Sequence, residues 1–161
     1  IDKDMDLPEW LEAKITIAAH NMNTVKDYLM LESIRFEERL QVEYQIEDEA
    51  FNYKIPPMML QTIVENAIKH GISNLVKGGI IEIKCREGLE DDLYIQVKNS
   101  GYLKTPPSLK PKADGGHGLS NTVQRLKLIY GDKARFRIFN SGNQFVITEI
   151  KIPKQRVTLE Q

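Results

Sequence analysis

The sequence predicts an α+β fold, a two-layer α/β sandwich in which helices cover one face of a mixed, largely antiparallel sheet. Helical and strand-like stretches follow one another in the order α-β-α-β-β-lid-α-β-β. Hairpin connections outnumber βαβ units in this order, which disfavours a doubly wound parallel sheet. With 161 residues and 41% hydrophobic content, the chain is long enough for one domain with a substantial core.

The first helix is predicted over residues 23–37, where apolar side chains recur at the i, i+3, i+4, i+7 spacing. Asn23 or Thr24 is its expected N-cap. Leu31 and Ile34 are expected to widen its apolar side. The residues at the repeating positions are Val25, Tyr28, Leu29, Glu32 and Phe36.

Five strands are predicted from alternating or short apolar runs. They cover residues 41–47, 80–86, 93–98, 134–139 and 144–152. The last two form a hairpin, because Gly142 supplies a left-handed-competent turn residue between them. Cys85 lies within the second strand, so we expect a packed structural thiol.

The helix predicted over residues 57–70 organises the rest of the chain. Pro57 suits its first position, and Gly71 is expected to end it in a left-handed conformation. Its apolar side carries Leu60, Ile63, Val64, Ala67 and Ile68. Its polar side carries Thr62, Glu65, Asn66, Lys69 and His70. A solvated face is the ordinary interpretation, but a carboxylate, an amide, a cation and an imidazole together also suit Mg²⁺ with phosphates.

A stretch without helical or strand periodicity follows the third predicted strand, residues 93–98. Residues 102–116 contain three prolines and three lysines, which predicts a mobile lid. Asn99-Ser100-Gly101 precedes this stretch where a strand ends, and Gly116-His117-Gly118 follows it. Glycines before a helix allow backbone N–H groups to approach an anion, although either motif alone is also typical of a simple turn or hinge.

A last helix is predicted over residues 118–130, ended by Gly131. Its apolar stripe is Leu119, Val123, Leu126 and Tyr130. The domain is expected to cover residues 23–153, with residues 1–22 a linker or the remnant of an upstream segment and residues 154–161 a tail.

Composition excludes several classes of partner and site. The net charge of −1 gives no electrostatic footprint for nucleic acid or for a polybasic membrane contact. A single cysteine excludes an internal disulfide and any CxxC metal site. No apolar run approaches the length of a membrane span, and His20 has no neighbouring acid, so it is expected at the surface or in packing.

Three stretches together resemble the LytS-type bacterial sensor histidine kinases. Residues 56–71 resemble the N box of that family, and residues 28–36 resemble the helix that precedes it. Residues 116–131, Gly-His-Gly-Leu-x-Asn-x-x-x-Arg-Leu-x-x-x-Tyr-Gly, resemble its second glycine box. The resemblance runs from about residue 23 to Pro153.

The resemblance implies a Bergerat-type fold that binds ATP with Mg²⁺. By the family's pattern, Asn66 would coordinate Mg²⁺, and Glu65 would polarise water or orient the metal shell. Lys69 and His70 would meet the phosphates. The remaining nucleotide-binding positions would be Asn99, Gly101, Gly116, His117, Gly118, Leu119 and Asn121.

The first glycine box departs from the family's Asp-x-Gly-x-Gly. Here it reads Asn99-Ser100-Gly101-Tyr102-Leu103, so an amide replaces the acid and Leu103 replaces the second glycine. An asparagine oxygen can still accept from the adenine amine. The substitution at residue 103 puts the hinge of the lid in question.

Nothing in the chain matches the family's phosphoacceptor histidine motif. The resemblance therefore implies a catalytic domain that passes the γ-phosphoryl group of ATP to a histidine on an upstream dimerisation segment. It further implies a response regulator as partner, a homodimeric full-length protein anchored in the inner membrane, and a cytoplasmic position for this domain. Two alternatives remain: a degenerate nucleotide- or partner-binding module without catalysis, and a self-contained hydrolase of the same fold.

Overall fold

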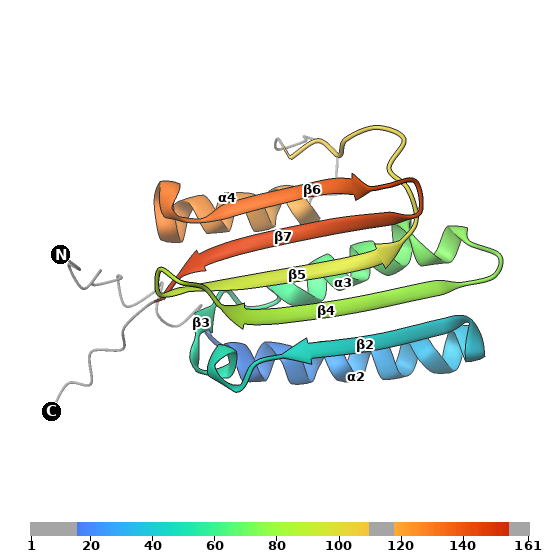
Figure 1. Ribbon diagram of the computed structural model, residues 1–161, viewed down its shortest axis with the longest axis horizontal. Coiled ribbons are helices and arrows are strands. Elements are labelled where there is room, and N and C mark those ends of the chain that lie inside the picture. The colour runs from blue at the N-terminus through green and yellow to red at the C-terminus, as the bar shows by residue number, and fades with distance from the viewer. Residues whose placement is uncertain (1–15, 110–117, 155–161) are drawn as a thin grey trace, which may run out of the picture.

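A computed structural model of the protein describes residues 16–109 and 118–154. Its main feature is a five-stranded sheet in the order β2-β4-β5-β7-β6 (Figure 1). The strands are β2 (Leu40–Ile46), β4 (Gly79–Glu87), β5 (Asp92–Ser100), β6 (Arg135–Ser141) and β7 (Phe145–Pro153). Only the β2–β4 pair is parallel, so the prediction of a mixed, largely antiparallel sheet is confirmed.

The α-helices of the described residues lie on one face of this sheet, which confirms the two-layer arrangement (Figure 1). They are α2 (Ala18–Phe36), α3 (Met59–His70) and α4 (Gly118–Tyr130). Two short strands, β1 (Thr16–Ile17) and β3 (Lys54–Ile55), pair antiparallel apart from the main sheet. After β2 the chain forms a 3₁₀ turn at Asp48–Asn52.

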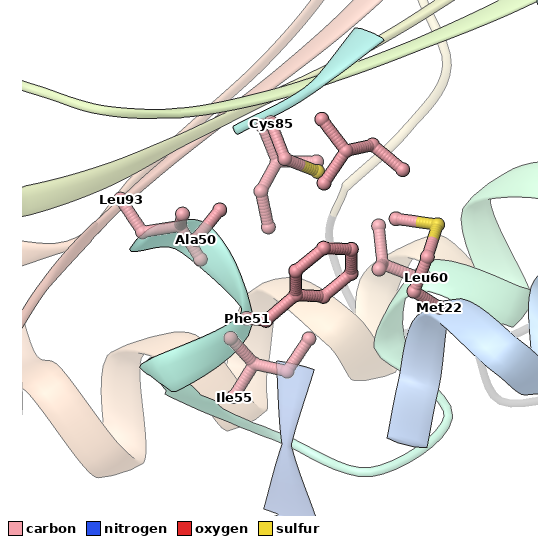
Figure 2. A pocket seen from close by; sticks show the side chains of 9 residues that line it. Met22, Ala50, Phe51, Ile55, Leu60, Cys85 and Leu93 are labelled. Carbon is pink, nitrogen blue, oxygen red and sulfur yellow. The ribbon is translucent and has the colours of Figure 1, made fainter. Parts of the chain in front are cut away.

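The core fills the space between the helices and the inner face of the sheet. Alternate residues of β4, β5 and β7 point toward the helices and are fully or almost fully buried, as the strand alternation predicts: Ile81, Ile83, Cys85, Leu93, Ile95, Val97, Ile150 and Ile152. Cys85, Phe51, Ile55, Leu60 and Met22 are among the residues that line an internal void of about 10 Å³. Figure 2 shows these side chains. Apolar walls and this small size make the void a packing gap.

Cys85 is the packed structural thiol that the sequence predicts. It is buried, and burial raises the pKa of its thiol to about 12. The thiol therefore stays protonated at neutral pH and acts as a small apolar side chain.

The first helix begins earlier than predicted. Because α2 starts at Ala18, Asn23 and Thr24 lie inside it, and the Thr24 hydroxyl donates to the His20 carbonyl oxygen at 3.1 Å. Neither residue is therefore the N-cap. The prediction that Leu31 and Ile34 widen the apolar side is also wrong, since they are 65% and 72% exposed.

The physical reason for the exposed pair is helical geometry. At 100° per residue, Leu31 and Ile34 fall on the side of α2 opposite Val25 and Leu29, which face the sheet and are buried. His20 is exposed, in agreement with its expected surface position. No helix in the described part of the chain is long and apolar enough to cross a membrane.

Both ends of α3 differ from the sequence prediction. Pro57 lies in a turn before the helix, and Met58 adopts a left-handed conformation with φ 64° ahead of the first helical residue, Met59. Gly71 ends the helix with φ −107° and ψ −84°, which is not left-handed. Residue 71 is glycine because β5 passes close to its Cα atom. The other two predicted glycine turns are confirmed, with φ 60° at Gly131 and φ 66° at Gly142.

Candidate functional site

A cavity of about 570 Å³ opens at the end of the sheet where β5 stops. Its walls come from the polar side of α3, the first turn of α4, the ends of β5, β6 and β7, and the segment that follows β5. A volume of this size is typical of small-molecule and cofactor sites in proteins.

Three separate stretches bring predicted site residues to this one cavity. They are Glu65, Asn66, Lys69 and His70 from α3, Asn99 from β5, and Gly118 and Leu119 from α4. Gly118 lies close to α3, because a Cβ added to it would lie 3.1 Å from the Thr62 methyl group. Arg125 on α4 donates to the carbonyl oxygen of Pro57, in the turn before α3, at 3.3 Å.

Two of the predicted residues that the structure describes, Asn121 and Gly101, are not among those that line the cavity. Asn121 is exposed on α4 and does not contribute to the wall. Gly101 does not line the cavity either, but it packs against Gly71, which does. Gly116 and His117 lie outside the described residues.

The polar side of α3 is accessible, as its sequence pattern predicts. Glu65, Lys69 and His70 are exposed and Asn66 is half-buried, whereas the apolar side of the same helix is buried in the core. The Gln61 side-chain amide donates to Glu65 Oε1 at 2.8 Å, one helical turn away. This hydrogen bond holds the Glu65 carboxylate in one orientation along the cavity wall.

Tyr28 of α2 lies near the same carboxylate. Burial raises the pKa of Tyr28 to about 12, and the nearby charges of Glu32 and Glu65 contribute in the same direction. The phenol therefore stays neutral at physiological pH and presents a hydroxyl group, not a charge, beside this part of α3.

Asn99 is a buried polar residue at the end of β5, only 4% exposed. Its Nδ2 donates to the Ser100 carbonyl oxygen at 3.0 Å, which leaves Oδ1 as the acceptor of this amide. Because Asn99 lines the cavity, its amide can contact a molecule that binds there.

The end of α3 packs directly against Asn99. A Cβ added to Gly71 would overlap the Asn99 amide and would lie 2.5 Å from the Ala67 carbonyl oxygen. Gly101, with φ 140°, lies against the same point, since a Cβ there would lie 3.3 Å from the Gly71 Cα atom. Glycine occurs at residue 71 because of this close approach, and not because the helix ends in a left-handed turn.

Several cavity residues are not apparent from the sequence. Ile138 from β6 and Val146 and Thr148 from β7 close the inner end of the site beside Asn99. The alternation of the last strand places Val146 and Thr148 on the inner face, and Thr148 is a buried hydroxyl residue among apolar neighbours. Only that single polar break in the buried row could have indicated its position; the strand order that brings β7 next to β5 is not readable from the pattern.

The donor chemistry of the cavity fits a magnesium ion held mainly by a phosphorylated ligand. In residues 16–109 and 118–154, no three acidic, histidine or cysteine side chains cluster closely enough to hold a metal. Mg²⁺ keeps several waters and binds through one or two protein oxygens together with substrate phosphates. An amide oxygen from Asn66, with Glu65 beside it, is a protein contribution of that kind.

Comparison with known proteins finds similar chains among bacterial sensor histidine kinases. No protein-family model matches the sequence. YwpD of Bacillus subtilis is 35% identical over 118 residues, which are 71% of this chain and 42% of YwpD. The sensor histidine kinase YpdA of Escherichia coli is 34% identical over 137 residues, 82% of this chain and 23% of YpdA. The sensor histidine kinase/phosphatase LytS of Staphylococcus aureus is 30% identical over 134 residues, 77% of this chain and 23% of LytS.

Solved structures with a similar fold include parts of histidine kinases. The catalytic domain of ThkA superposes with a TM-score of 0.60 at 17% identity, covering 87% of this chain and 95% of that domain. The mycobacterial sensor histidine kinase MprB gives a TM-score of 0.59 at 14% identity, covering 89% of this chain and 98% of that chain. Identities this low show a common fold.

The fold of this chain is that of the histidine kinase catalytic domains. Within that class the chain belongs to the LytS-type sensor histidine kinases, since YpdA and LytS match it along more than three quarters of its length. The chain spans less than half the length of each of the relatives described above.

Proposed function

We propose that this domain binds ATP with Mg²⁺ in the cavity and supplies the γ-phosphoryl group to a histidine side chain. The observation that carries this proposal is the convergence of three distant stretches on one cavity of about 570 Å³. The N box contributes Asn66, the strand end contributes Asn99, and the start of α4 contributes Gly118. The structure of full-length ShkA, which has a TM-score of 0.62 to this chain, contains the ATP analogue AMPPNP.

The adenine would bind at the inner end of the cavity. Ile138 and Val146 offer apolar surface for the faces of the ring, and Thr148 and Asn99 offer polar groups for its edge. Since Nδ2 of Asn99 already donates to Ser100, Oδ1 is the atom that would accept from the adenine amine. Guanine carries a carbonyl oxygen at the same position, and two acceptors would face each other.

This arrangement predicts selectivity for adenine over guanine. ATP is expected to bind about 5- to 150-fold more tightly than GTP, because an unmatched buried polar group costs on the order of 1–3 kcal/mol. Asn99→Ala is expected to weaken ATP binding and to reduce the ratio between the two affinities. Competition titrations against one labelled nucleotide measure both quantities. Equal affinities for ATP and GTP in the unmodified chain would exclude this role of Asn99.

The phosphates would lie between α3 and the start of α4. The first backbone N–H groups of α4 and its helix dipole favour an anion at Gly118 and Leu119, and Lys69 adds a cation from α3. When bound, Mg²⁺ neutralises phosphate charge in the reaction, and Asn66 is the residue that would hold it. No charged loop of the Walker type is needed for this arrangement.

Glu65 would orient the groups around the transferred phosphate. Gln61 holds its carboxylate by the 2.8 Å hydrogen bond, so the side chain keeps one direction at the cavity wall. Glu65→Gln retains the size of the side chain but removes the charge. It is expected to leave ATP affinity within a few-fold and to lower phosphoryl transfer at least about tenfold.

The experiment that tests the proposed function is autophosphorylation of a protein that includes the residues upstream of Ile1, with γ-labelled ATP. Acid-labile, base-stable label on that protein supports transfer to histidine, and its loss in Glu65→Gln supports the role of the carboxylate. ATP binding without transfer would favour a degenerate binding module. Sustained phosphate release by this chain alone, lost in Glu65→Gln, would favour the hydrolase.

The finer assignments concern the rest of the protein. LytS and YpdA are named as sensor histidine kinases and are more than twice as long as this chain. We accordingly propose that the acceptor histidine lies on an upstream dimerisation segment and that a response regulator receives the phosphoryl group. The same relationship supports a homodimeric, membrane-anchored full-length protein with this domain on the cytoplasmic side.

A further inference from the structure

Asn140 of β6 holds the backbone of Leu103 with both ends of its side-chain amide. The Leu103 N–H donates to Asn140 Oδ1 at 2.8 Å, and Asn140 Nδ2 donates to the Leu103 carbonyl oxygen at 2.9 Å. This reciprocal pair has the pattern of one rung of a β-ladder, in which a side-chain amide takes the place of a peptide group. It attaches the segment after β5 to the edge strand of the sheet.

The contact fixes the point at which the chain leaves the sheet. The Gly101 N–H donates to the Gln144 carbonyl oxygen at 2.9 Å, so pairing with the β6–β7 hairpin continues past the end of β5. Along residues 101–109, Leu103 is the last described residue whose backbone is hydrogen-bonded to the sheet. The direction of residues 104–109 is therefore set at Leu103.

Leu103 belongs to the inner end of the cavity. It lines the cavity itself, and the residue that holds it, Asn140, is paired in the sheet with Val146, another lining residue. Asn140 is not part of the lining. Lys69 and Asn66, which would face the phosphates, lie on α3 and not on this hairpin. A shift of Leu103 would therefore disturb the base-binding end of the site.

We propose that Asn140 is a positioning residue for nucleotide binding, which keeps Leu103 in place as part of the wall against the base. This inference rests on the proposed function. Without the clamp, the free protein would sample other backbone conformations at Leu103, and binding would have to order this residue again. The expected consequence is a loss of affinity of about tenfold, the size expected for ordering one backbone residue.

The proposal also predicts which nucleotides are affected. ATP and ADP share the base, so the Asn140→Ala variant should lose affinity for both by the same factor. A defect at the phosphate end, by contrast, would weaken ATP more than ADP. The ratio of the two affinities thus separates a base-end positioning role from a general disturbance of the cavity.

The test is calorimetric titration of ATP and ADP, with Mg²⁺ present, into the unmodified chain, Asn140→Ala and the matched control Asn143→Ala. Asn143 is exposed in the turn of the same hairpin and does not line the cavity. Hydrogen exchange at the Leu103 amide is measured in parallel. We expect faster exchange and about tenfold weaker binding of both nucleotides for Asn140→Ala only.

A second variant keeps the proposal testable if alanine destabilises the hairpin. Asn140→Asp retains an acceptor for the Leu103 N–H, but its second oxygen would face the Leu103 carbonyl oxygen and repel it. It should show the same parallel loss for ATP and ADP.

Three results would decide against the proposal. Unchanged affinity in a variant whose Leu103 amide exchanges rapidly overturns the inference alone. A loss confined to ATP also overturns it. An unmodified, folded chain that binds neither nucleotide overturns the proposed function, and the inference with it.

Discussion

Replacing Gly71 with alanine is expected to lower the melting temperature and to abolish nucleotide binding together. The added methyl group would overlap the Asn99 side-chain amide and would lie 3.0 Å from the Ser100 carbonyl oxygen. Overpacking of this kind costs about 1–3 kcal/mol. Relief of the overlap would require movement of α3 away from β5 or of Asn99 toward the cavity, and either change displaces the base-binding acceptor.

Gly131→Ala is the matched control for this substitution. Gly131 ends α4 with φ 60°, so alanine there is strained, but a Cβ at that position meets no atom within 4 Å. It should cost about 1 kcal/mol of stability through the backbone alone and leave nucleotide affinity unchanged. Thermal melting and nucleotide titration of both variants make the comparison. A Gly71→Ala chain that binds ATP normally would show that the α3–Asn99 contact does not shape the site.

Asn66→Ala is expected to separate binding from stability. Asn66 lies on the polar side of α3, half-buried in the cavity wall and away from the core. Alanine is the better helix former by about 0.6 kcal/mol, so the melting temperature should stay the same or rise slightly. Loss of the amide oxygen should weaken Mg²⁺-dependent ATP binding at least about tenfold, because the ion loses its protein ligand.

The control for Asn66→Ala is Asn23→Ala, an exposed asparagine in α2 that gains the same helix propensity far from the cavity. It should leave ATP affinity unchanged with and without Mg²⁺. If Asn66→Ala melts at a much lower temperature, then Asn66 is a structural residue and its assignment to the metal is wrong.

The elements and their faces could be predicted from the sequence, because local periodicity carries that information. The two sides of α3 and the buried row of β7 are where the pattern places them. What the pattern cannot contain is how residues from different elements meet. The tight contact between Gly71 and Asn99 depends on where α3 ends over β5. The sequence indicates that Gly71 ends the helix, but the close approach of Asn99 explains why the residue is glycine.

The site residues divide in the same way, into those that a local motif marks and those that only the fold brings to the cavity. Glu65, Asn66, Asn99 and Gly118 are marked by their motifs, and the structure brings them to one cavity. Thr148 is marked only as a polar break in the buried row of β7, and Asn140 has no local signal of function. Their roles come from the β5-β7-β6 strand order and from a hydrogen bond that spans 37 positions in the chain. Leu31 and Ile34 are apolar but exposed, which shows that apolar character alone does not determine burial.

The central claim is that this cavity is an ATP·Mg²⁺ site, and a direct titration of the chain with ATP tests it most simply. Calorimetry in the presence of Mg²⁺ should show saturable binding of one nucleotide per chain, much weaker binding after removal of the metal with a chelator, and competition by ADP. Absence of binding at millimolar ATP, in a sample that melts cooperatively, would contradict the account.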